Sequence, residues 1–183
     1  MVFLFLIAIS GAIVWLLINN FGKAQNLLTE SLYPIKYSDC VDKASNDYDL
    51  EKPLIYAVIR TESDFNPNAE SHVGAVGLMQ VMPESFEWIK GLRGESESLE
   101  KLSEPSVNID YGSYLLKYFL NYYGNEQCAV AAYNAGFVVS DWLKDEEYSS
   151  DGKTLKKIPY PETEKYVKKV LRAKKMYNKL YFS

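Results

Sequence analysis

A glutamate on the apolar face of a short helical pattern is the most chemically suggestive residue of this sequence. Ile55, Val58 and Ile59 precede Glu62 at helical spacing within residues 54–63, so the carboxyl group falls on the face expected to be buried. Burial disfavours the ionised form of a carboxyl group and raises its pKa. An acid that stays protonated near neutral pH can donate a proton to a leaving group, which makes Glu62 a candidate general acid. Position alone also fits a glutamate at a frayed helix end, or a buried glutamate paired with an arginine.

The segment after Glu62 is built to bring backbone and polar groups close to a ligand. A turn over residues 64–67 is followed by a loop that Gly74 and Gly77 frame, and glycine allows close backbone approach and positive φ. Gln80 follows this loop and can both donate to and accept from amide and hydroxyl groups. Met79 beside it suits the floor under a sugar ring or an acetamido methyl group, although a methionine in the core is the commoner case.

Four segments, in this order along the chain, resemble the catalytic domain of the soluble lytic transglycosylases, which are relatives of goose-type lysozyme. The resemblance extends over about residues 39–180, and the long middle helix, with Asn108-Ile109 and Gly112, fits it as well. The four segments are Glu62-Ser63, Gly77-Leu78-Met79-Gln80, Ala132-Tyr133-Asn134, and Pro161-Glu162-Thr163 followed by Tyr166-Val167.

This resemblance implies an enzyme that acts on the glycan strands of peptidoglycan. It would cleave the β-1,4 bond between N-acetylmuramic acid and N-acetylglucosamine and leave a 1,6-anhydromuramoyl end. Glu62 would serve first as the acid and then as the base, so that a second carboxylate is dispensable, unlike in ordinary glycosidases. No cofactor and no metal are expected.

Seven further residues are expected by resemblance to bind or position the substrate. Met79 and Gln80 would contact acetamido groups, and Ser63 would contact the cleaved bond or position Glu62. The structural alternative for Ser63 is a turn hydroxyl. The seven are Ser63, Met79, Gln80, Tyr133, Asn134, Glu162 and Tyr166.

The aromatic and C-terminal members of this set also have structural alternatives. Tyr133 would hydrogen-bond near Glu62 or stabilise positive charge at C1, or it is a tyrosine at the core edge. Asn134 would bind substrate or end a helix. Glu162 would orient a hydrogen-bond network, or its negative charge simply interacts favourably with the N-terminal end of the helix dipole. Tyr166 is a sugar platform or a core residue.

Two other functions fit the same residues. A lysozyme of this fold would hydrolyse the bond with water in place of the muramoyl C6 hydroxyl. A glycan-binding module would hold the strand without turnover, although an intact Glu62 disfavours it.

Composition narrows the possible partners. The 183-residue chain has a formal net charge of −4, which argues against nucleic-acid binding because that needs a basic surface. Cys40 and Cys128 are the only cysteines, and no Cys/His cluster indicates a metal site. The two thiols either pair, if the domain lies outside the cytoplasm, or stay free.

A mainly α fold is expected to position these residues, since no stretch shows sustained strand alternation. The lysozyme-like transglycosylase domain of packed helices is assigned to residues 38–183, after a tether over residues 23–37. Residues 91–104 and 145–157 are expected to be surface loops. Helices are expected over residues 38–44 with Ser38 as N-cap, from near Pro53 to Ser63, and over residues 84–89, 106–123, 126–135 and 161–181.

The N-terminal residues 1–22 are expected to be a transmembrane anchor or a signal segment. Residues 2–18 form an uncharged apolar run, long enough for a helix that spans a bilayer. A cleaved signal peptide is the alternative, but no basic residue precedes the run. The catalytic domain would then lie at the cell membrane, facing the cell wall, or be secreted if the segment is cleaved. A tethered enzyme of this kind also suggests a wall-remodelling or secretion complex.

Overall fold

The structure is a computed structural model that describes Trp15, Asn20, Gly22 and residues 29–183. Contacts divide the chain into two units, residues 1–34 and residues 35–183, and the architecture below is that of the second unit. The expected anchor lies almost wholly outside the described residues. Within the part that is described, no helix is both long and apolar enough to cross a bilayer.

Residues 35–183 form a packed helical unit, as the sequence predicts. Five main helices are α2 (Ser38–Tyr48), α3 (Lys52–Ser63), α4 (Pro83–Arg93), α5 (Pro105–Tyr123) and α6 (Glu126–Ala135). The unit also contains two 3-10 turns, Leu99–Ser103 and Gly136–Val138, and the helices α7 (Val139–Lys144) and α8 (Pro161–Tyr177). A π-helical turn, Asn178–Phe182, follows α8. Among the residues described there are no strands, only isolated bridges from Val76 to Glu70 and Val81.

Helix α3 is the centre of the core. Pro53 stands in its first turn, where a missing N–H is harmless, and every residue from Pro53 to Ile59 is buried. A helix that is apolar all round must be covered on all sides, and α3 packs chiefly against α8 and also against α2. Its end is set by Asp64, whose backbone is left-handed (φ 49°) and whose N–H donates to the carbonyl of Arg60. Glu62 therefore lies in the last turn of the most buried helix.

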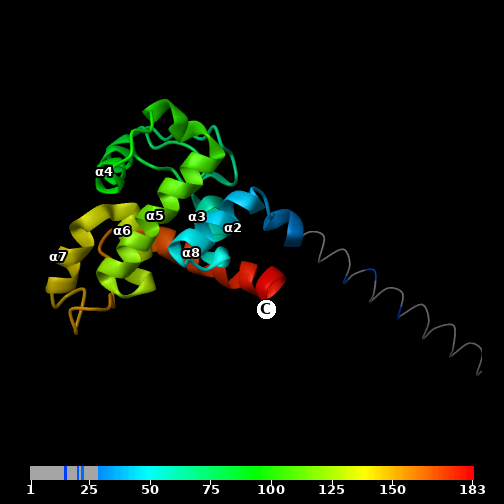
Figure 1. The fold of residues 1–183 in the computed structure, drawn as a ribbon. Coiled ribbons are helices and arrows are strands. Elements are labelled where there is room, and N and C mark those ends of the chain that lie inside the picture. Colours follow the sequence, from blue (N-terminus) through cyan, green and yellow to red (C-terminus); the bar gives the residue numbers. More distant parts are fainter. Residues whose placement is uncertain (1–14, 16–19, 21, 23–28) are drawn as a thin grey trace, which may run out of the picture. The chain divides into compact units, whose positions relative to one another are not determined.

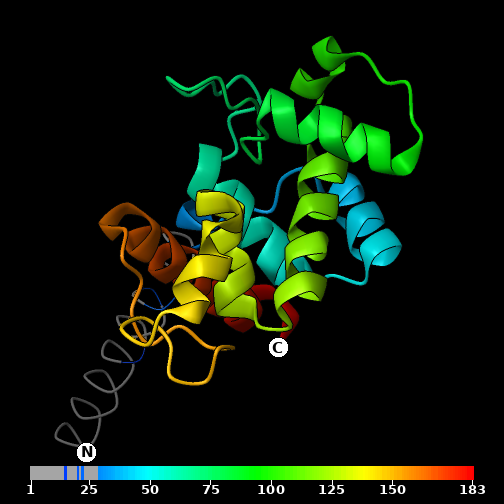
Figure 2. The same ribbon diagram turned by 90° about the vertical axis from the view of Figure 1, so that its left-hand side faces the viewer.

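Helix α5 spans the unit from end to end. In both ribbon views α4 and the loop of residues 64–82 lie at one end, and α7 with the loop of residues 145–160 lies at the other (Figures 1 and 2). The first half of α5 contacts the loop, and α5 packs against α6 and α2. This placement brings groups from α3, α5, α6 and α8 to a common region beside the loop.

Three details of the expected helices are wrong. Ser38 is not the N-cap of α2, because Tyr37 takes that position with left-handed backbone and no side-chain cap bond forms. The helix runs past residue 44 to Tyr48, and it ends at Asp49, whose backbone is left-handed (φ 49°) and whose N–H donates to the carbonyl of Ser45. The region 91–104 is not all loop, since α4 continues to Arg93 and Leu99–Ser103 forms a 3-10 turn around buried Leu102.

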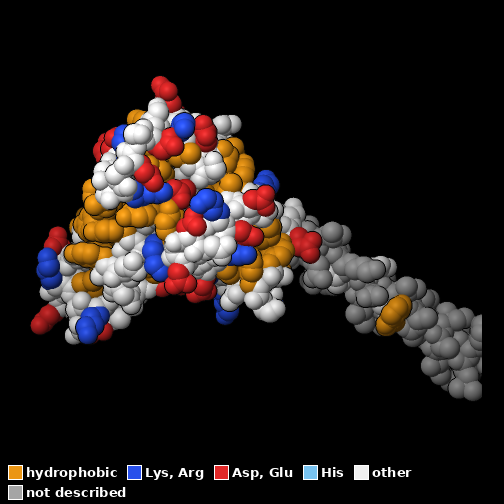
Figure 3. All heavy atoms as spheres, in the orientation of Figure 1, with side chains coloured by type: hydrophobic (Ala, Val, Ile, Leu, Met, Phe, Trp, Pro, Cys, Tyr) orange, Lys and Arg blue, Asp and Glu red, His pale blue; other side chains and the backbone are white. Residues whose placement is uncertain are grey.

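Helix α7 was not expected. Val139 and Trp142 are buried on one side of this six-residue helix, a stripe too short to stand out by periodicity. Apolar side chains also gather on the surface between α4 and α6 (Figure 3). Ring contacts join Trp88, Tyr118, Tyr122 and Phe137 there, so part of the aromatic content serves packing at this edge.

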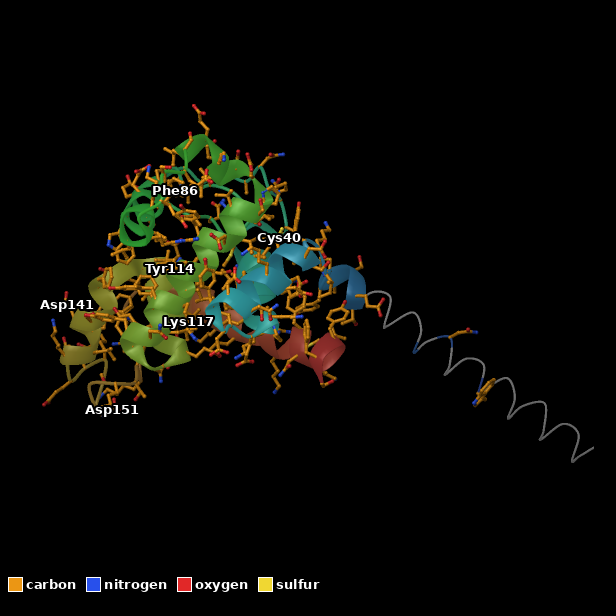
Figure 4. All side chains as sticks on the ribbon, viewed as in Figure 1. Cys40, Phe86, Tyr114, Lys117, Asp141 and Asp151 are labelled. Atoms are coloured by element: carbon orange, nitrogen blue, oxygen red, sulfur yellow. The ribbon has the colours of Figure 1, made fainter. Side chains whose placement is uncertain are left out.

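Both cysteines are free thiols. Cys40 lies on α2, whereas the Cys128 thiol is 3.5 Å from the carbonyl oxygen of Lys153, near Asp151 at the opposite end of the unit (Figure 4). Of the two states that the sequence left open, the structure therefore contains the unpaired one.

Candidate active site

Glu62 lies in a pocket of about 380 Å³ at the junction of α3, α6 and α8. This pocket, called the Glu62 pocket below, unites four of the residues expected from the sequence, namely Glu62, Asn134, Glu162 and Tyr166, with three that were not expected. Its lining consists of Thr61, Glu62, Asn134, Glu162, Lys165, Tyr166 and Lys169.

The carboxyl group of Glu62 is held by one hydrogen bond and by burial. The Tyr166 hydroxyl donates to Oε1 of Glu62 at 2.7 Å. Burial raises the pKa of Glu62 from 4.5 to about 7, and the hydrogen bond from Tyr166, which favours the charged form, opposes this rise. Because Oε1 accepts from Tyr166, the proton of the neutral acid belongs on Oε2. The site thus holds a carboxyl group whose protonated form persists near neutral pH, as a general acid requires.

Two tyrosine hydroxyls near Glu62 remain protonated donors. Burial and then the charge of Glu62 raise the pKa of Tyr133 well above its ordinary value, and the same two causes act first on the pKa of Tyr166. Tyr133 donates its proton to the carbonyl oxygen of Met79 at 2.8 Å. Tyr166 is therefore a support for Glu62 rather than an exposed platform, since its side chain is 7% exposed.

The loop of residues 76–80 is anchored to three helices. Ser63 of α3 donates its hydroxyl to the carbonyl oxygens of Leu78 (2.8 Å) and Ile59 (3.1 Å). Asn108 of α5 accepts from the Met79 N–H at 2.7 Å, and Tyr133 of α6 holds the Met79 carbonyl. The hydroxyl of Ser63 thus fixes the loop to the end of α3 and makes no bond to Glu62 itself, so its expected roles at the cleaved bond and at Glu62 stay predictions.

Asn108 is the central anchor of this loop, a site role that is not among those expected from the sequence. Its side chain is fully buried, and its amide nitrogen donates to the carbonyl oxygens of Val76 (2.8 Å) and Leu102 (2.9 Å). Gly77 makes this possible, because a Cβ there would lie 2.4 Å from Nδ2 of Asn108 and its φ is +80°. The sequence offers no signal for this role, because α5 carries other polar residues, such as Asp110, at comparable positions.

Met79 and Gln80 do not both occupy the positions expected. The side chain of Met79 is fully buried, 3.8 Å from the Ser113 hydroxyl, so the expected contact between this side chain and an acetamido group is wrong for this structure. Gln80 has left-handed backbone (φ 47°), and its Nε2 donates to the carbonyls of Ala69 and Gly77, both at 3.0 Å. Its Oε1 is the atom left to face a ligand.

Helices α6 and α8 are joined beside the pocket. Thr163, in the first turn of α8, donates its hydroxyl to Oδ1 of Asn134 at 2.7 Å. Glu162 and Asn134 are exposed side chains on the pocket wall. Among the residues that the structure describes, two carboxylates line this pocket, those of Glu62 and Glu162. The carboxylates of Asp64, next to the end of α3, and of Glu84, at the start of α4, do not line it.

A larger pocket of about 930 Å³ lies between α2, α5 and residues 93–97, and Glu62 is absent from its lining. Its principal charged groups satisfy one another: Arg93 contacts Asp110 and Glu95, each at 2.7 Å. These ion pairs bind α5 to the end of α4, so we assign this pocket to the scaffold and the Glu62 pocket to the chemistry.

Comparison with known proteins identifies one family. The family model described as "Transglycosylase SLT domain" matches residues 39–155. The chain is 36% identical over 151 residues to the soluble lytic murein transglycosylase of Salmonella typhimurium, covering 78% of this chain and 23% of that protein. It is 32% identical over 168 residues to the membrane-bound lytic murein transglycosylase C of Cronobacter sakazakii, covering 79% and 47%.

Solved structures show the same fold. The 70 kDa soluble lytic transglycosylase of Escherichia coli superposes with a TM-score of 0.75 and 29% identity, over 85% of this chain and 26% of that one. An inactive glutamate-to-glutamine mutant of lytic transglycosylase Slt from Pseudomonas aeruginosa superposes with a TM-score of 0.71 and 32% identity, over 80% and 24%. The chain thus spans about a quarter of the length of these relatives.

Proposed function

The chain belongs to the transglycosylase SLT domain family, and from that premise we propose that it is a lytic transglycosylase acting on peptidoglycan. The bond cleaved is the β-1,4 linkage between N-acetylmuramic acid and N-acetylglucosamine, and the product carries a 1,6-anhydromuramoyl end. The observation that carries this proposal is Glu62, a carboxylic acid with its pKa raised to about 7, held by Tyr166 in an open pocket.

The reaction needs one carboxyl group in two successive roles. Protonated Glu62 gives the proton on Oε2 to the glycosidic oxygen, and the bond from C1 to that oxygen breaks. The carboxylate then takes the proton of the muramoyl C6 hydroxyl, whose oxygen bonds to C1. Glu62 is protonated again at the end, and no water is consumed. Because the attacking hydroxyl belongs to the same sugar, its proximity replaces a second catalytic group.

The remaining polar groups of the pocket bind and orient the strand. Asn134 and Glu162 face the pocket from α6 and α8 and offer hydrogen bonds to sugar hydroxyl and acetamido groups. Oε1 of Gln80 accepts from an acetamido N–H, while its Nε2 keeps the loop closed. Ser63 and Tyr133 hold the same loop in register with Glu62.

Product analysis tests this function and separates its alternatives. Purified protein incubated with peptidoglycan should release muropeptides with anhydromuramoyl ends, as identified by mass spectrometry. Reducing muramoyl ends would instead show a lysozyme-type hydrolase. Binding to the strands without any release would show a glycan-binding module.

Replacing Tyr166 by phenylalanine should change the pH dependence of cleavage as well as the rate. The lost hydrogen bond favoured ionised Glu62, so its pKa should rise and the alkaline limb of kcat against pH should move to higher pH. We expect kcat to fall about 10-fold, because a hydrogen bond to a charged group contributes about 1.5–3 kcal/mol and only part of it is realised in catalysis.

Tyr160→Phe is the matched control, since Tyr160 precedes α8, is half-exposed, and packs its ring on Trp142 outside the Glu62 pocket. It should leave the pH profile unchanged. A profile of Tyr166→Phe that is identical in shape to the parent's would contradict the role given to this hydroxyl.

The apolar run of residues 2–18 would hold the catalytic domain at a membrane, facing the wall. Relatives named both soluble and membrane-bound occur at similar identity, and either arrangement is compatible with the family. A membrane-held enzyme of this size would suit a wall-remodelling or secretion complex. Fractionation of cells that produce the full chain, with and without residues 1–22, tests the anchor.

A further inference from the structure

Two lysines on the wall of the Glu62 pocket have no use in the proposed cleavage. Lys165 and Lys169 stand one helical turn apart on α8, so their side chains share a face. Both side chains are exposed, and both line the same pocket as Glu62. A neutral glycan offers no group that requires a cation, so the pair needs another explanation.

Other lysines of α8 are engaged with carboxylates. Lys168 pairs with Glu164 at 2.6 Å, and Lys174 contacts Glu51 at 3.0 Å and also Glu126. In contrast, Lys165 and Lys169 make no ion pair with any residue that the structure describes. Their ammonium groups are therefore available to a ligand that enters the pocket.

The pocket is locally cationic in a protein whose net charge is −4. When Glu62 carries its proton, the formal charges on the wall are two ammonium groups against the single carboxylate of Glu162. A small anionic group fits such a wall better than a second cation or a neutral sugar. Two cations about one turn apart can bind the two oxygens of one carboxylate.

We propose that Lys165 and Lys169 bind a free carboxylate of the peptide stem carried by the muramoyl residue at the cleaved bond. The proposal rests on the proposed function, since peptidoglycan is the polymer that presents such stems beside its glycosidic bonds. Stem carboxylates are attached to the sugar whose C6 hydroxyl attacks, and they reach the pocket wall when that sugar lies over Glu62. The lysine pair would thus make the enzyme select stem-bearing strands over bare glycan.

A comparison of two substrates tests this selectivity. Peptidoglycan freed of phosphate-containing wall polymers would be prepared with its stems intact. One portion would be stripped of stems by an amidase, and the lactyl carboxylates that this hydrolysis leaves on the muramoyl residues would be capped as methylamides. Lys165→Gln/Lys169→Gln should lower kcat/KM on stem-bearing strands by about 5- to 10-fold, because two exposed ion pairs are lost. Its kcat/KM on stem-free strands should equal that of the parent. Added salt should reduce the parent's preference for stems.

The matched control removes the same charge from the same helix. Lys168→Gln/Lys175→Gln also subtracts two positive charges, from residues outside the pocket lining. It should leave kcat/KM unchanged on both substrates. Lys165→Arg/Lys169→Arg keeps the charges and should restore the preference for stems. Equal losses on both substrates, or no loss on stem-bearing strands, would overturn the proposal. A loss that appears only when phosphate-containing polymers are left on the wall would assign the lysines to phosphate instead, which also overturns it.

Binding measured without turnover keeps this test separate from that of the proposed function. In a Glu62→Gln background, calorimetry with a soluble stem-bearing muramoyl saccharide should show an affinity about 5- to 10-fold weaker after the double lysine substitution. If the parent made no anhydromuramoyl ends, the proposed function would fail, whereas this affinity difference would still decide the role of the lysines.

Discussion

Replacing Glu62 by glutamine should lower kcat for glycan cleavage by about 10²- to 10⁴-fold, the range that a positioned general acid contributes. The amide keeps the size of the carboxyl group and can still accept from the Tyr166 hydroxyl, but it cannot give up a proton and take one back. KM should change little, because the substitution removes an interaction made only in the transition state. The measurement is the initial rate of release of anhydromuramoyl ends from purified peptidoglycan.

Glu84→Gln is the matched control for this substitution. Glu84 is an exposed carboxylate in the first turn of α4 and lies outside the Glu62 pocket. Its replacement should leave kcat within about twofold of the parent, as expected for a surface position. A Glu62→Gln protein that cleaves at the rate of the parent would remove Glu62 from the mechanism.

The same substitution should stabilise the fold at neutral and alkaline pH. The pKa of Glu62 in the folded protein is raised from 4.5 to about 7, so the folded state binds the proton more tightly than the unfolded chain does. The contribution of this group to the free energy of unfolding therefore decreases as pH rises from about 4.5 to 7 and stays low above that, by at most about 3 kcal/mol. Glu62→Gln lacks this penalty, so thermal unfolding at pH 8 should occur at a higher temperature than in the parent, and the gap should close near pH 4. A gap that widens toward acid pH would contradict the buried acid.

Replacing Asn108 by alanine should cost about 3–5 kcal/mol of folding stability. The substitution leaves the Met79 N–H and the carbonyls of Val76 and Leu102 without the partner that they have now, in a place closed to solvent. Each unsatisfied buried group costs about 1–3 kcal/mol, and a small cavity adds to this. In a domain of this size the midpoint of thermal unfolding should fall by about 10 °C or more. Cleavage should also slow, since the loop that adjoins Glu62 loses its central anchor.

Asn121→Ala supplies the comparison for this loss, because Asn121 lies on the same helix with its side chain exposed. Its unfolding midpoint should match the parent's within about 2 °C. If Asn108→Ala unfolded within that margin too, the loop would not depend on the three hydrogen bonds that we assign to Asn108.

The helices that carry the site were largely predictable from the sequence because their apolar periodicity is strong. The pattern through Ile55 and Val58 set the face of α3 on which Glu62 lies, and the structure buries that face. Helix ends were less predictable, since α2 ends at Asp49 in a left-handed backbone conformation that its side chain does not indicate. Helix α7 offers only Val139 and Trp142 as buried residues, too few for periodicity to indicate a helix.

The acid of the site and some of the residues around it were predictable from the sequence. Glu62 was indicated by its own helix, and the resemblance brought in Asn134, Glu162 and Tyr166, which the fold places with it in one pocket. The structure holds Met79 in the core, the commoner of the two cases considered for it, and this position depends on close approach to Gly112, where a Cβ would lie 2.7 Å from the sulfur.

The roles of the lysines and of Asn108 needed the packed structure. On a helical wheel Lys165 and Lys169 belong to a charged face that is most simply solvated, and only the approach of α3 and α6 turns part of that face into a pocket wall. Two of the three partners of Asn108, the Met79 N–H and the Val76 carbonyl, lie in a loop about 30 residues earlier in the sequence, so no local pattern marks them.

Cleavage in water enriched in heavy oxygen tests the central claim most directly, because it asks which oxygen attacks C1. If the muramoyl C6 hydroxyl attacks while Glu62 serves as acid and then base, the new ends are 1,6-anhydromuramoyl groups and mass spectrometry finds no heavy oxygen in them. Heavy oxygen at C1 of new reducing ends would show that water attacks, and would contradict a transglycosylase mechanism for this protein.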